Sequence, residues 1–304
     1  MKIGVIGTFI RDRIFPWQRP ELSSIGGIFF TVSYLANLLG SSDEIYPVCN
    51  IGTDFYDEVS SRLLAYPNVR LDGLTKLARD NTQVRLYYTG PQERDEITTA
   101  PMPPVTFEQT LLLKEADAVI VNLITGCDVE LAALRRFRQA SQALVYLDFH
   151  SHALGIGQHG ERFYSRPPDW REWIDQVDVL QVNEMEARTL AGLTEAAPVE
   201  LLVEFGRQVL QLRPSVCHIT LADKGSYLCY SKQGEVHVQR VPAQHVSDVV
   251  DIIGCGDAFE AAYVVKALGG ADEITATAFA HRVAAANCTF LGSTGIKEIQ
   301  RMIG

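Results

Sequence analysis

The fold of this chain is decided by one stretch, Val250-Asp251-Ile252-Ile253-Gly254-Cys255-Gly256-Asp257-Ala258-Phe259, which joins an apolar run to a helical pattern. Small residues at the start of a helix leave backbone N–H groups uncovered, and the helix dipole adds partial positive charge, so we expect an anion site here. Asp257 would repel a bound anion. We therefore interpret it as a base that takes a proton from a nucleophile while the N–H groups hold the developing charge. For an isolated motif, a simple helix-capping role would suffice.

Length and composition set the class of protein. The chain has 304 residues, of which 47% are apolar, so it can form one large α/β domain or two small ones and is not expected to be disordered. It contains 27 basic and 37 acidic residues, which leave a net charge of −10. This charge argues against a nucleic-acid partner.

The cysteines and the N-terminus indicate the compartment. Six cysteines form no Cys-x-x-Cys pair, so we expect reduced thiols rather than disulfides or a zinc site. The first residues, Met1 to Gly7, are a short strand pattern and not a signal peptide. No apolar run is long enough to cross a bilayer. We therefore expect a cytoplasmic protein without a membrane partner.

Strand and helix patterns alternate from residue 105 onward. Apolar runs predict strands at 117–122, 143–148, 177–182 and 215–221, and a hairpin at 226–231 and 236–241. Helical periodicity predicts helices at 107–115, 129–140, 169–175, 184–192, 198–211 and 271–290, with a short last helix from Gly295. This alternation is typical of a parallel sheet covered on both faces, with ligands bound where the carboxyl ends of the strands meet.

The first hundred residues carry the same pattern less regularly. We expect strands at 2–6, 8–14 and 44–49, an irregular segment at 16–25, a helix from Gly26-Gly27 to Leu39, and a helix that ends near residue 65. Two strands at 82–89 and 96–99 have no helical partner, so we interpret them as a flap that stands off the main sheet. The chain, 1–304, is thus predicted to be a single α/β domain with a lid from about 10–25 and 80–100.

Further motifs fall on predicted strand ends. An Asn-x-x-Glu motif at 183–186 follows one strand, Thr-Leu-x-x-x-Gly at 220–225 follows the next, and the glycine pair 26–27 precedes a helix. In this order they resemble the PfkB/ribokinase family of small-molecule kinases over nearly the whole chain. Residues 251–259 match best, reading D-I-I-G-C-G-D-A-F against D-T-x-G-A-G-D-x-F. The resemblance implies a ribokinase-like three-layer sandwich, with a mostly parallel central sheet, helices on both faces and a small β lid.

The resemblance also implies a role for each matching residue. Asp257 is expected to be the general base, and the backbone of Gly254, Cys255 and Gly256 the anion hole for the transferring phosphoryl group. Positions near the nucleotide are expected at Asn183, Glu186, Thr220, Ala222, Gly225 and Asn287. Glu186 would organise Mg²⁺ through water, and Asp251, with the loop at 291–293, would bind a monovalent cation.

On the acceptor side, the family's sugar-binding positions match Asp12, Gly26, Gly27 and Thr31. The implied cofactors are ATP and Mg²⁺, and the implied partner is a small-molecule sugar or nucleoside. A lid is physically reasonable because it excludes water from the reaction. A flap with one apolar face would either pair with its twin in a homodimer or close over the site.

The sequence departs from the family at several positions. Ile252 replaces a threonine, Cys255 an alanine, and Thr31 an asparagine that contacts substrate. Asp57 replaces the last glycine of G-x-D-x-x-G, and residues 148–152, Asp-Phe-His-Ser-His, replace D-x-N-x-R. These changes suggest an unusual acceptor rather than an inactive protein, because the base and the glycines of the anion hole remain.

Two functions of different classes stay open. The first is an ATP-dependent kinase acting on a hydroxyl of a sugar or nucleoside. The second is a non-catalytic nucleotide- or sugar-binding regulatory protein on a kinase fold, which the changes at Thr31 and Ile252 motivate. A dehydrogenase is disfavoured because no G-x-G-x-x-G follows the first strand. A phosphorylated acceptor is also disfavoured, unless the lid brings together Arg11, Arg13, Arg85 and Arg94.

Overall fold

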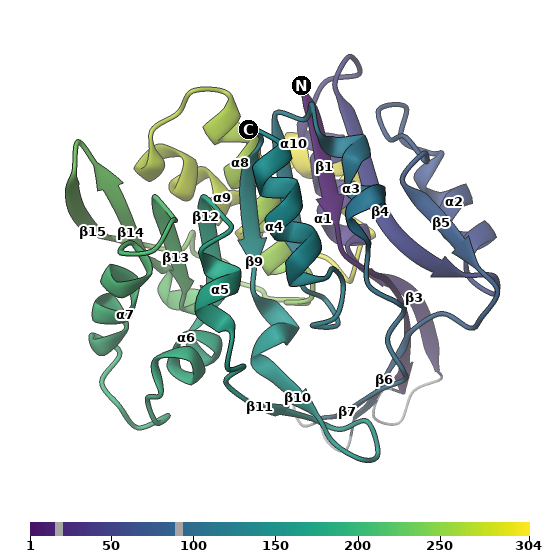
Figure 1. Cartoon of the computed structure of the whole chain (residues 1–304), viewed down its shortest axis with the longest axis horizontal. Coiled ribbons are helices and arrows are strands. Elements are labelled where there is room, and N and C mark those ends of the chain that lie inside the picture. The colour runs from purple at the N-terminus through teal and green to yellow at the C-terminus, as the bar shows by residue number, and fades with distance from the viewer. Residues whose placement is uncertain (16–20, 89–93) are drawn as a thin grey trace.

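A mostly parallel sheet forms the centre of the molecule. The computed structural model describes residues 1–15, 21–88 and 94–304. The main sheet has nine strands in the order β15-β14-β13-β12-β9-β8-β1-β4-β5 (Figure 1). These are β1 Lys2–Ile6, β4 Glu44–Gly52, β5 Leu74–Leu77, β8 Ala118–Asn122, β9 Leu144–Asp148, β12 Val179–Asn183, β13 Val216–Thr220, β14 Ser226–Lys232 and β15 Glu235–Val241. All neighbouring strands from β5 to β13 are parallel. At the other edge, β14 pairs antiparallel with both β13 and β15.

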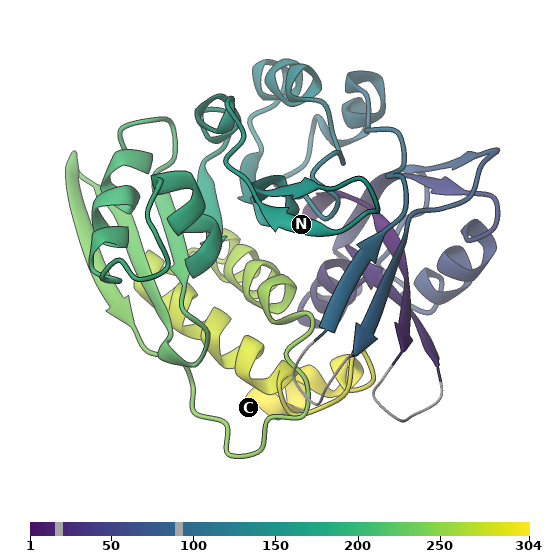
Figure 2. The ribbon, with the colours of Figure 1, turned by 90° about the horizontal axis from the view of Figure 1, so that it is seen from below.

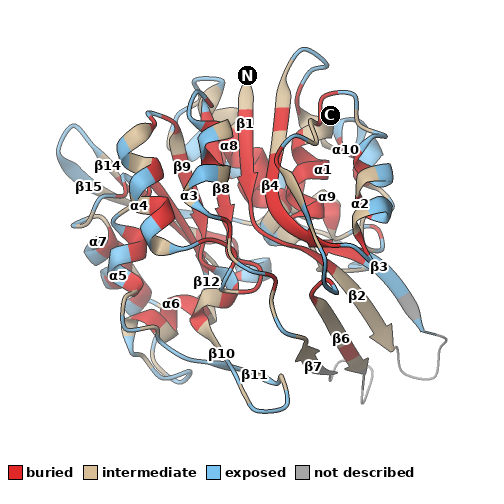
Figure 3. Cartoon of the chain, turned by 45° about the vertical axis from the view of Figure 1, so that its right-hand side comes forward, coloured by how far each residue is buried: buried red, intermediate tan, exposed pale blue. Residues whose placement is uncertain are grey.

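Helices cover both faces of this sheet (Figure 2). One apolar core packs the sheet against α1 Phe29–Leu38, α2 Tyr56–Leu63, α8 Cys255–Leu268, α9 Glu273–Asn287 and α10 Ile299–Ile303. A second core packs it against α3 Phe107–Thr110, α4 Leu131–Ala140, α5 Trp170–Ile174, α6 Glu184–Ala191 and α7 Leu201–Val209. The central strands are buried on both faces, which explains their nearly continuous apolar runs (Figure 3). The predicted three-layer α/β sandwich is confirmed.

A second sheet of four strands projects from the main sheet and is called the lid sheet here (Figure 3). Its order is β3-β2-β6-β7, with β2 Phe9–Phe15, β3 Leu22–Gly27, β6 Gln83–Tyr88 and β7 Arg94–Thr98. Strands β2 and β6 are parallel, and the outer pairs are antiparallel. The predicted flap therefore exists, and the strand expected at 8–14 belongs to it rather than to the main sheet.

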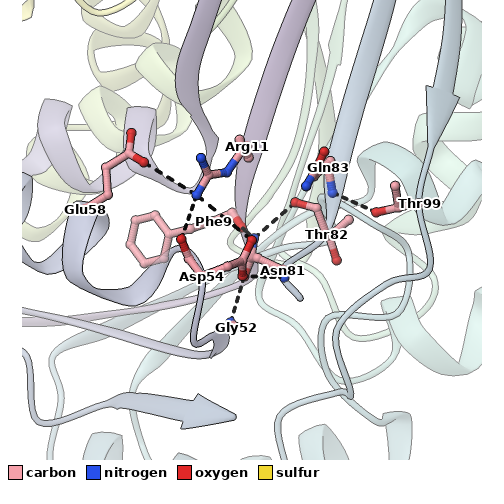
Figure 4. A network of polar contacts seen from close by, with 9 residues as sticks. All are labelled: Phe9, Arg11, Gly52, Asp54, Glu58, Asn81, Thr82, Gln83 and Thr99. Atoms are coloured by element: carbon pink, nitrogen blue, oxygen red, sulfur yellow. Dashed lines mark hydrogen bonds and ion pairs between the residues drawn. The ribbon is translucent and has the colours of Figure 1, made fainter. Parts of the chain in front are cut away.

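One asparagine joins the base of the lid sheet to the main sheet (Figure 4). The side-chain amide of Asn81 donates to Phe9 O at 2.8 Å and to Thr82 O at 3.0 Å. Its Oδ1 accepts from the N–H of Gly52, the last residue of β4, at 3.0 Å. Because Asn81 is buried, these bonds fix how both lid strands leave the core.

Several local expectations were wrong. Residues 22–27 form β3 instead of an irregular segment, because they pair with β2 over six positions; residues 16–20 lie outside the described part of the chain. Consequently Gly26 and Gly27 end a strand, and the helix begins only at Phe29. The helix expected at 107–115 is α3 followed by a 3-10 turn, and the helix expected at 271–290 ends at Asn287. Three short strands had not been predicted: β5, β10 Leu154–Ile156 and β11 Arg162–Tyr164.

Candidate active site

A cavity of about 460 Å³ lies where β9, β12 and β13 end, between the lid sheet and the start of α8. The predicted site residues that line it are Asp12, Gly27, Asn183, Glu186, Thr220, Gly254, Cys255, Gly256 and Asp257. A larger hollow of about 660 Å³ lies between the C-terminal end of α8 and the first half of α9, and no carboxylate lines it. The smaller cavity is therefore the candidate active site, because it alone of the two holds a base.

The start of α8 has the geometry of an anion site. Gly254, its N-cap, has φ +83°, and a Cβ there would lie 2.5 Å from Cδ1 of Phe30, so only glycine fits. In the described part of the chain, the N–H groups of Gly254 and Gly256 have no acceptor, whereas that of Cys255 donates to Ile252 O at 3.3 Å. Two N–H groups of the predicted three are thus left for a ligand, with the helix dipole behind them.

Asp257 lies in the first turn of α8 and lines the cavity. Its Oδ1 accepts hydrogen bonds from Thr31 Oγ1 at 2.7 Å and from Asn122 Nδ2 at 3.2 Å. The protein raises the pKa of Asp257 to about 6, because burial disfavours its charge more than the hydrogen bonds favour it. A carboxyl with this pKa is ionised at neutral pH and still basic enough to take part in proton transfer.

Two further buried carboxyls lie beside Asp257. Asp148 ends β9, and its pKa is raised to about 8 by burial first and then by the charge of Asp257. Glu186 lies in the first turn of α6, and its pKa is raised well above the usual range by burial and then by the charge of Asp148. Such carboxyls repel one another when ionised, and a bound divalent cation would relieve that repulsion.

Glu186 suits an indirect magnesium role. The N–H of Asn183 donates to Glu186 Oε2 at 2.8 Å, and the N–H of Glu186 donates to Asn183 Oδ1 at 2.9 Å, which makes a capping box. This box fixes the carboxylate in the cavity wall and leaves oxygen lone pairs for water. No cluster of three metal-ligating side chains occurs among the described residues. Mg²⁺ does not require one, because it keeps waters and phosphate oxygens as ligands.

The groups around Asp251 fit a monovalent cation less well than those around Glu186 fit Mg²⁺. Asp251 Oδ1 accepts from the N–H of Ile253 at 3.0 Å, and Oδ2 accepts from the N–H of Gly292 at 2.8 Å. Ile252 adds no side-chain oxygen, where a threonine would. Both carboxylate oxygens therefore already tie the loop at 251–253 to the loop at 291–293.

On the lid side, Asp12 lines the cavity from the middle of β2. Its carboxyl covers Gly26: a Cβ at Gly26 would lie 2.0 Å from Asp12 Oδ2. Gly27 has φ +62°, and a Cβ there would lie 2.1 Å from Thr8 O. Thr31 is fully buried and lies outside the cavity lining, beneath Asp257. Gly26 thus leaves room for the carboxyl of Asp12, and Gly27 for the backbone carbonyl of Thr8.

A sequence profile described as "pfkB family carbohydrate kinase" matches residues 24–299. The chain belongs to this family. Solved structures of the family fold superimpose on it throughout. Ribokinase from Thermotoga maritima has a TM-score of 0.77 at 18% identity, covering 99% of this chain and 98% of that one. Ribokinase from Arabidopsis thaliana, complexed with ribose and ATP, has a TM-score of 0.78 at 18% identity with the same coverage.

Other relatives of this kinase family extend the comparison. A pyrophosphate-dependent kinase of the ribokinase family has a TM-score of 0.78 at 18% identity, covering 99% of both chains. A curated ribokinase of Arabidopsis thaliana is 33% identical over 109 residues, which are 33% of this chain and only 25% of that protein. In the described residues, no helix is long and apolar enough to span a membrane.

Some residues that the family resemblance assigns to the nucleotide lie outside the cavity lining. Ala222 and Gly225 form a turn after β13, with φ +51° and +86°. Asn287 is buried beneath the loop before α8, where its amide donates to Ile253 O at 2.8 Å and its carbonyl accepts from the hydroxyl of Tyr34. Asn287 therefore supports the loop that carries Gly254.

Three residues of the site had no assigned role in the sequence interpretation. Asn122 bonds Asp257 from the end of β8, Gln181 Nε2 donates to Gly256 O at 3.3 Å from β12, and Glu260 is buried one turn after Asp257. Each has the same sequence signal, a lone polar residue within or at the end of an apolar element. That signal identifies buried polar groups but not the partner that each will meet.

Proposed function

We propose that this protein transfers the terminal phosphoryl group of ATP to a hydroxyl group of a sugar or nucleoside. The observation that carries the proposal is one cavity that combines a carboxyl of pKa about 6, Asp257, with the two uncommitted N–H groups at Gly254 and Gly256. The family of the chain supports the same reaction class. A base beside an anion hole is what phosphoryl transfer to an alcohol requires.

In this mechanism Asp257 accepts the proton of the acceptor hydroxyl as its oxygen attacks the phosphorus. The N–H groups of Gly254 and Gly256 hold the charge on the transferring group, and the positive end of α8 adds to their effect. Mg²⁺, held through water near Glu186, would neutralise charge on the phosphates. Asp251 and the monovalent cation have no part in these steps.

The donor is proposed to be ATP rather than pyrophosphate, although both kinds of kinase share this fold. Three large apolar side chains beside the anion hole are exposed: Val250 by 57%, Ile252 by 68% and Leu291 by 57%. They lie on the two loops that the bond between Asp251 and Gly292 joins. Exposed apolar surface at this position suits a nucleoside base, whereas pyrophosphate has nothing to place on it.

The acceptor is proposed to be uncharged or cationic. The carboxyls of Asp12, Asp148, Glu186 and Asp257 line the cavity, and no Lys or Arg among the described residues does. Two lid arginines already pair with carboxylates, Arg11 with Glu58 at 3.6 Å and Arg13 with Glu21 at 2.6 Å. Arg85 does not line the cavity. The side chain of Arg94 lies outside the described residues. A phosphorylated sugar would find no basic side chain there and would meet the negative charge of ionised Asp257.

The proposal also includes the domain organisation of the chain and the role of its lid. We treat residues 1–304 as a single domain whose lid, about 10–25 and 80–100, closes over the acceptor. The lid sheet has β3 and β7 as its edges, so a homodimer formed by pairing two lids stays a prediction. Sedimentation equilibrium distinguishes the dimer from a monomer that uses its lid only as a cover.

The test is an assay of ADP release with ATP and Mg²⁺ over free sugars, sugar phosphates and nucleosides; when pyrophosphate replaces ATP as the donor, release of orthophosphate is measured instead. Turnover with one acceptor class, lost in Asp257→Asn while ATP binding measured by calorimetry persists, supports the proposal. ATP binding without turnover on any acceptor would favour the regulatory alternative. Turnover with pyrophosphate alone would overturn the donor assignment.

A further inference from the structure

Glu260 is a buried acid that the mechanism above does not use. It lies one turn after Asp257 on α8 and is 0% exposed. Its Oε1 contacts Thr31 Oγ1 at 2.7 Å and Asn122 Nδ2 at 2.9 Å. The same two groups contact Oδ1 of Asp257, at 2.7 and 3.2 Å. Thr31 and Asn122 therefore bridge the two carboxyls.

A count of protons shows that these contacts need one more hydrogen than two carboxylates allow. The hydroxyl of Thr31 has a single hydrogen, yet its oxygen lies 2.7 Å from an oxygen of each carboxyl. It can donate to only one of them. If both carboxyls were ionised, the other contact would bring two oxygen lone pairs together in a buried site. A proton on one carboxyl turns that contact into a hydrogen bond.

We propose that Glu260 holds this proton and donates it to Thr31 Oγ1, so that Thr31 in turn donates to Asp257 Oδ1. Glu260 is then a positioning residue: it acts through Thr31, directs the hydroxyl toward the base and leaves Asp257 as the ionised member of the pair. The other oxygen of Asp257 stays available to the acceptor. This inference rests on the proposed function of Asp257 as the base.

The surroundings of Glu260 favour the protonated form. Burial raises its pKa well above the usual range, and the charges of Asp148 and Asp257 raise it further, against the hydrogen bonds from Thr31 and Asn122. Tyr146 on β9 is a further titratable neighbour; burial raises its pKa well above the usual range, and a charge on Glu260 would raise it further. No Lys, Arg or His in the described residues forms an ion pair with Glu260. The proton therefore goes to Glu260, which is fully buried, rather than to Asp257, which is partly exposed at the cavity.

The test compares wild type with Glu260→Gln by infrared difference spectroscopy at pH 8. We expect a carbonyl stretch of a protonated carboxyl in wild type that the variant lacks. Absence of such a difference would overturn the proposal, because Glu260 would then be ionised. The measurement needs no turnover, so it can support the proton assignment even if the proposed kinase reaction fails.

The pH profile of kcat/KM gives the second readout. If Glu260 is neutral, Glu260→Gln removes no charge, and the apparent pKa of the acidic limb should move by less than about 0.5 units. If Glu260 is ionised, losing a negative charge beside Asp257 should lower that pKa by about one unit or more, which would refute the proposal. The pH profile therefore distinguishes a neutral Glu260 from an ionised one.

Three more variants separate the loss of the proposed proton from an effect on folding. Thr31→Val removes the acceptor of the proposed proton, so the carboxyl stretch of Glu260 should persist but shift; an unshifted stretch would count against the proposal. Val264→Ala removes buried volume one turn further along α8 and should lower the melting temperature while kcat stays within about twofold of wild type. Glu260→Leu should lower kcat at least about tenfold. Equal losses of kcat in Glu260→Leu and Val264→Ala would reduce Glu260 to a packing residue.

Discussion

The hydroxyl of Thr31 lies 2.7 Å from Oδ1 of Asp257, although 226 positions separate the two residues in the chain. Thr31 occupies a position that the family resemblance assigns to the acceptor and at which the family usually has a substrate-contacting asparagine. Here the side chain is fully buried and contacts the proposed base from below. The departure that motivated a non-catalytic interpretation thus coincides with a contact that orients the base.

Thr31→Val should therefore impair catalysis rather than acceptor binding. The hydrogen bond from Thr31 lowers the pKa of Asp257, so its removal should move the acidic limb of kcat/KM to higher pH. A hydrogen bond to a charged group contributes about 1.5–3 kcal/mol, so kcat should fall roughly 10- to 100-fold. Thr31→Ser is the control and should keep the wild-type profile. An unchanged profile in the valine variant would contradict the contact.

The ionised carboxyl of Asp257 should lower the free energy of unfolding at neutral pH. Its folded pKa is about 6, against about 3.9 for an unfolded aspartate, so the folded state binds the proton more tightly. The resulting penalty is absent below pH 4, develops between pH 4 and 6 and is complete above pH 6. Asp257→Asn should raise the free energy of unfolding by on the order of 1–3 kcal/mol at pH 7.5 and far less at pH 4. Urea titrations at both pH values check this, and an equal effect at both would refute it.

Two glycines of the anion hole allow a matched test. Gly254→Ala puts a Cβ 2.5 Å from Phe30 at a positive φ, so it should destabilise the fold by about 1–3 kcal/mol as well as abolish turnover. A Cβ on Gly256 would meet Gln181 Nε2 only at 3.5 Å, an ordinary contact. Gly256→Ala should fold like wild type yet lose about 10²- to 10³-fold in kcat, since the methyl group obstructs the phosphoryl group. Full activity in a folded Gly256→Ala would remove Gly256 from the anion hole.

Asn81→Ala should loosen the base of the lid sheet. It removes three side-chain hydrogen bonds at a buried position, which should cost about 2–4 kcal/mol of stability. We expect a higher KM for the acceptor with a smaller change in KM for ATP, and faster hydrogen exchange in β2 and β6. Thr99→Val, which removes one bond accepted from the N–H of Gln83, is the milder control. Equal increases in both KM values would argue against a lid that acts on the acceptor.

Cys255 should make the anion hole sensitive to oxidants. Its Sγ lies 3.2 Å from Sγ of Cys288, and a hydrogen bond between the two thiols lowers the pKa of Cys288 to about 7. Diamide should inactivate the enzyme, dithiothreitol should restore it, and Cys288→Ser should resist. Cys127 is exposed, so Cys127→Ser serves as the control and should stay as sensitive as wild type. Loss of activity at the same rate in Cys288→Ser would exclude this pair as the target.

The sequence predicted the elements that depend on local pattern. Apart from β5, the strands of the main sheet and the start of α8 were recognisable because apolar period and glycine placement are local properties. Strand β3 was not, because its sequence, Leu-Ser-Ser-Ile-Gly-Gly, has no alternating apolar face and only the pairing with β2 makes it a strand. The short hairpin of β10 and β11 was missed for the same reason.

The residues of the candidate site also differ in whether a local sequence pattern reveals them. Asp257, Gly254 and Gly256 lie within one motif and could be found together. The contacts that set the pKa of Asp257 come from α1 and β8, so no local pattern shows them. The proton count at Glu260 likewise depends on distances between elements that are remote in sequence.

The cavity has two kinds of wall. The proposed base and anion hole lie on α8, which is packed into the core, whereas Asp12, Val84 and Leu86 line the proposed acceptor side from the lid sheet. Substitutions in β2 or β6 can therefore change which alcohol is accepted without moving the groups that transfer phosphate. A kinase built in this way can acquire new acceptors over evolutionary time while its chemistry stays the same.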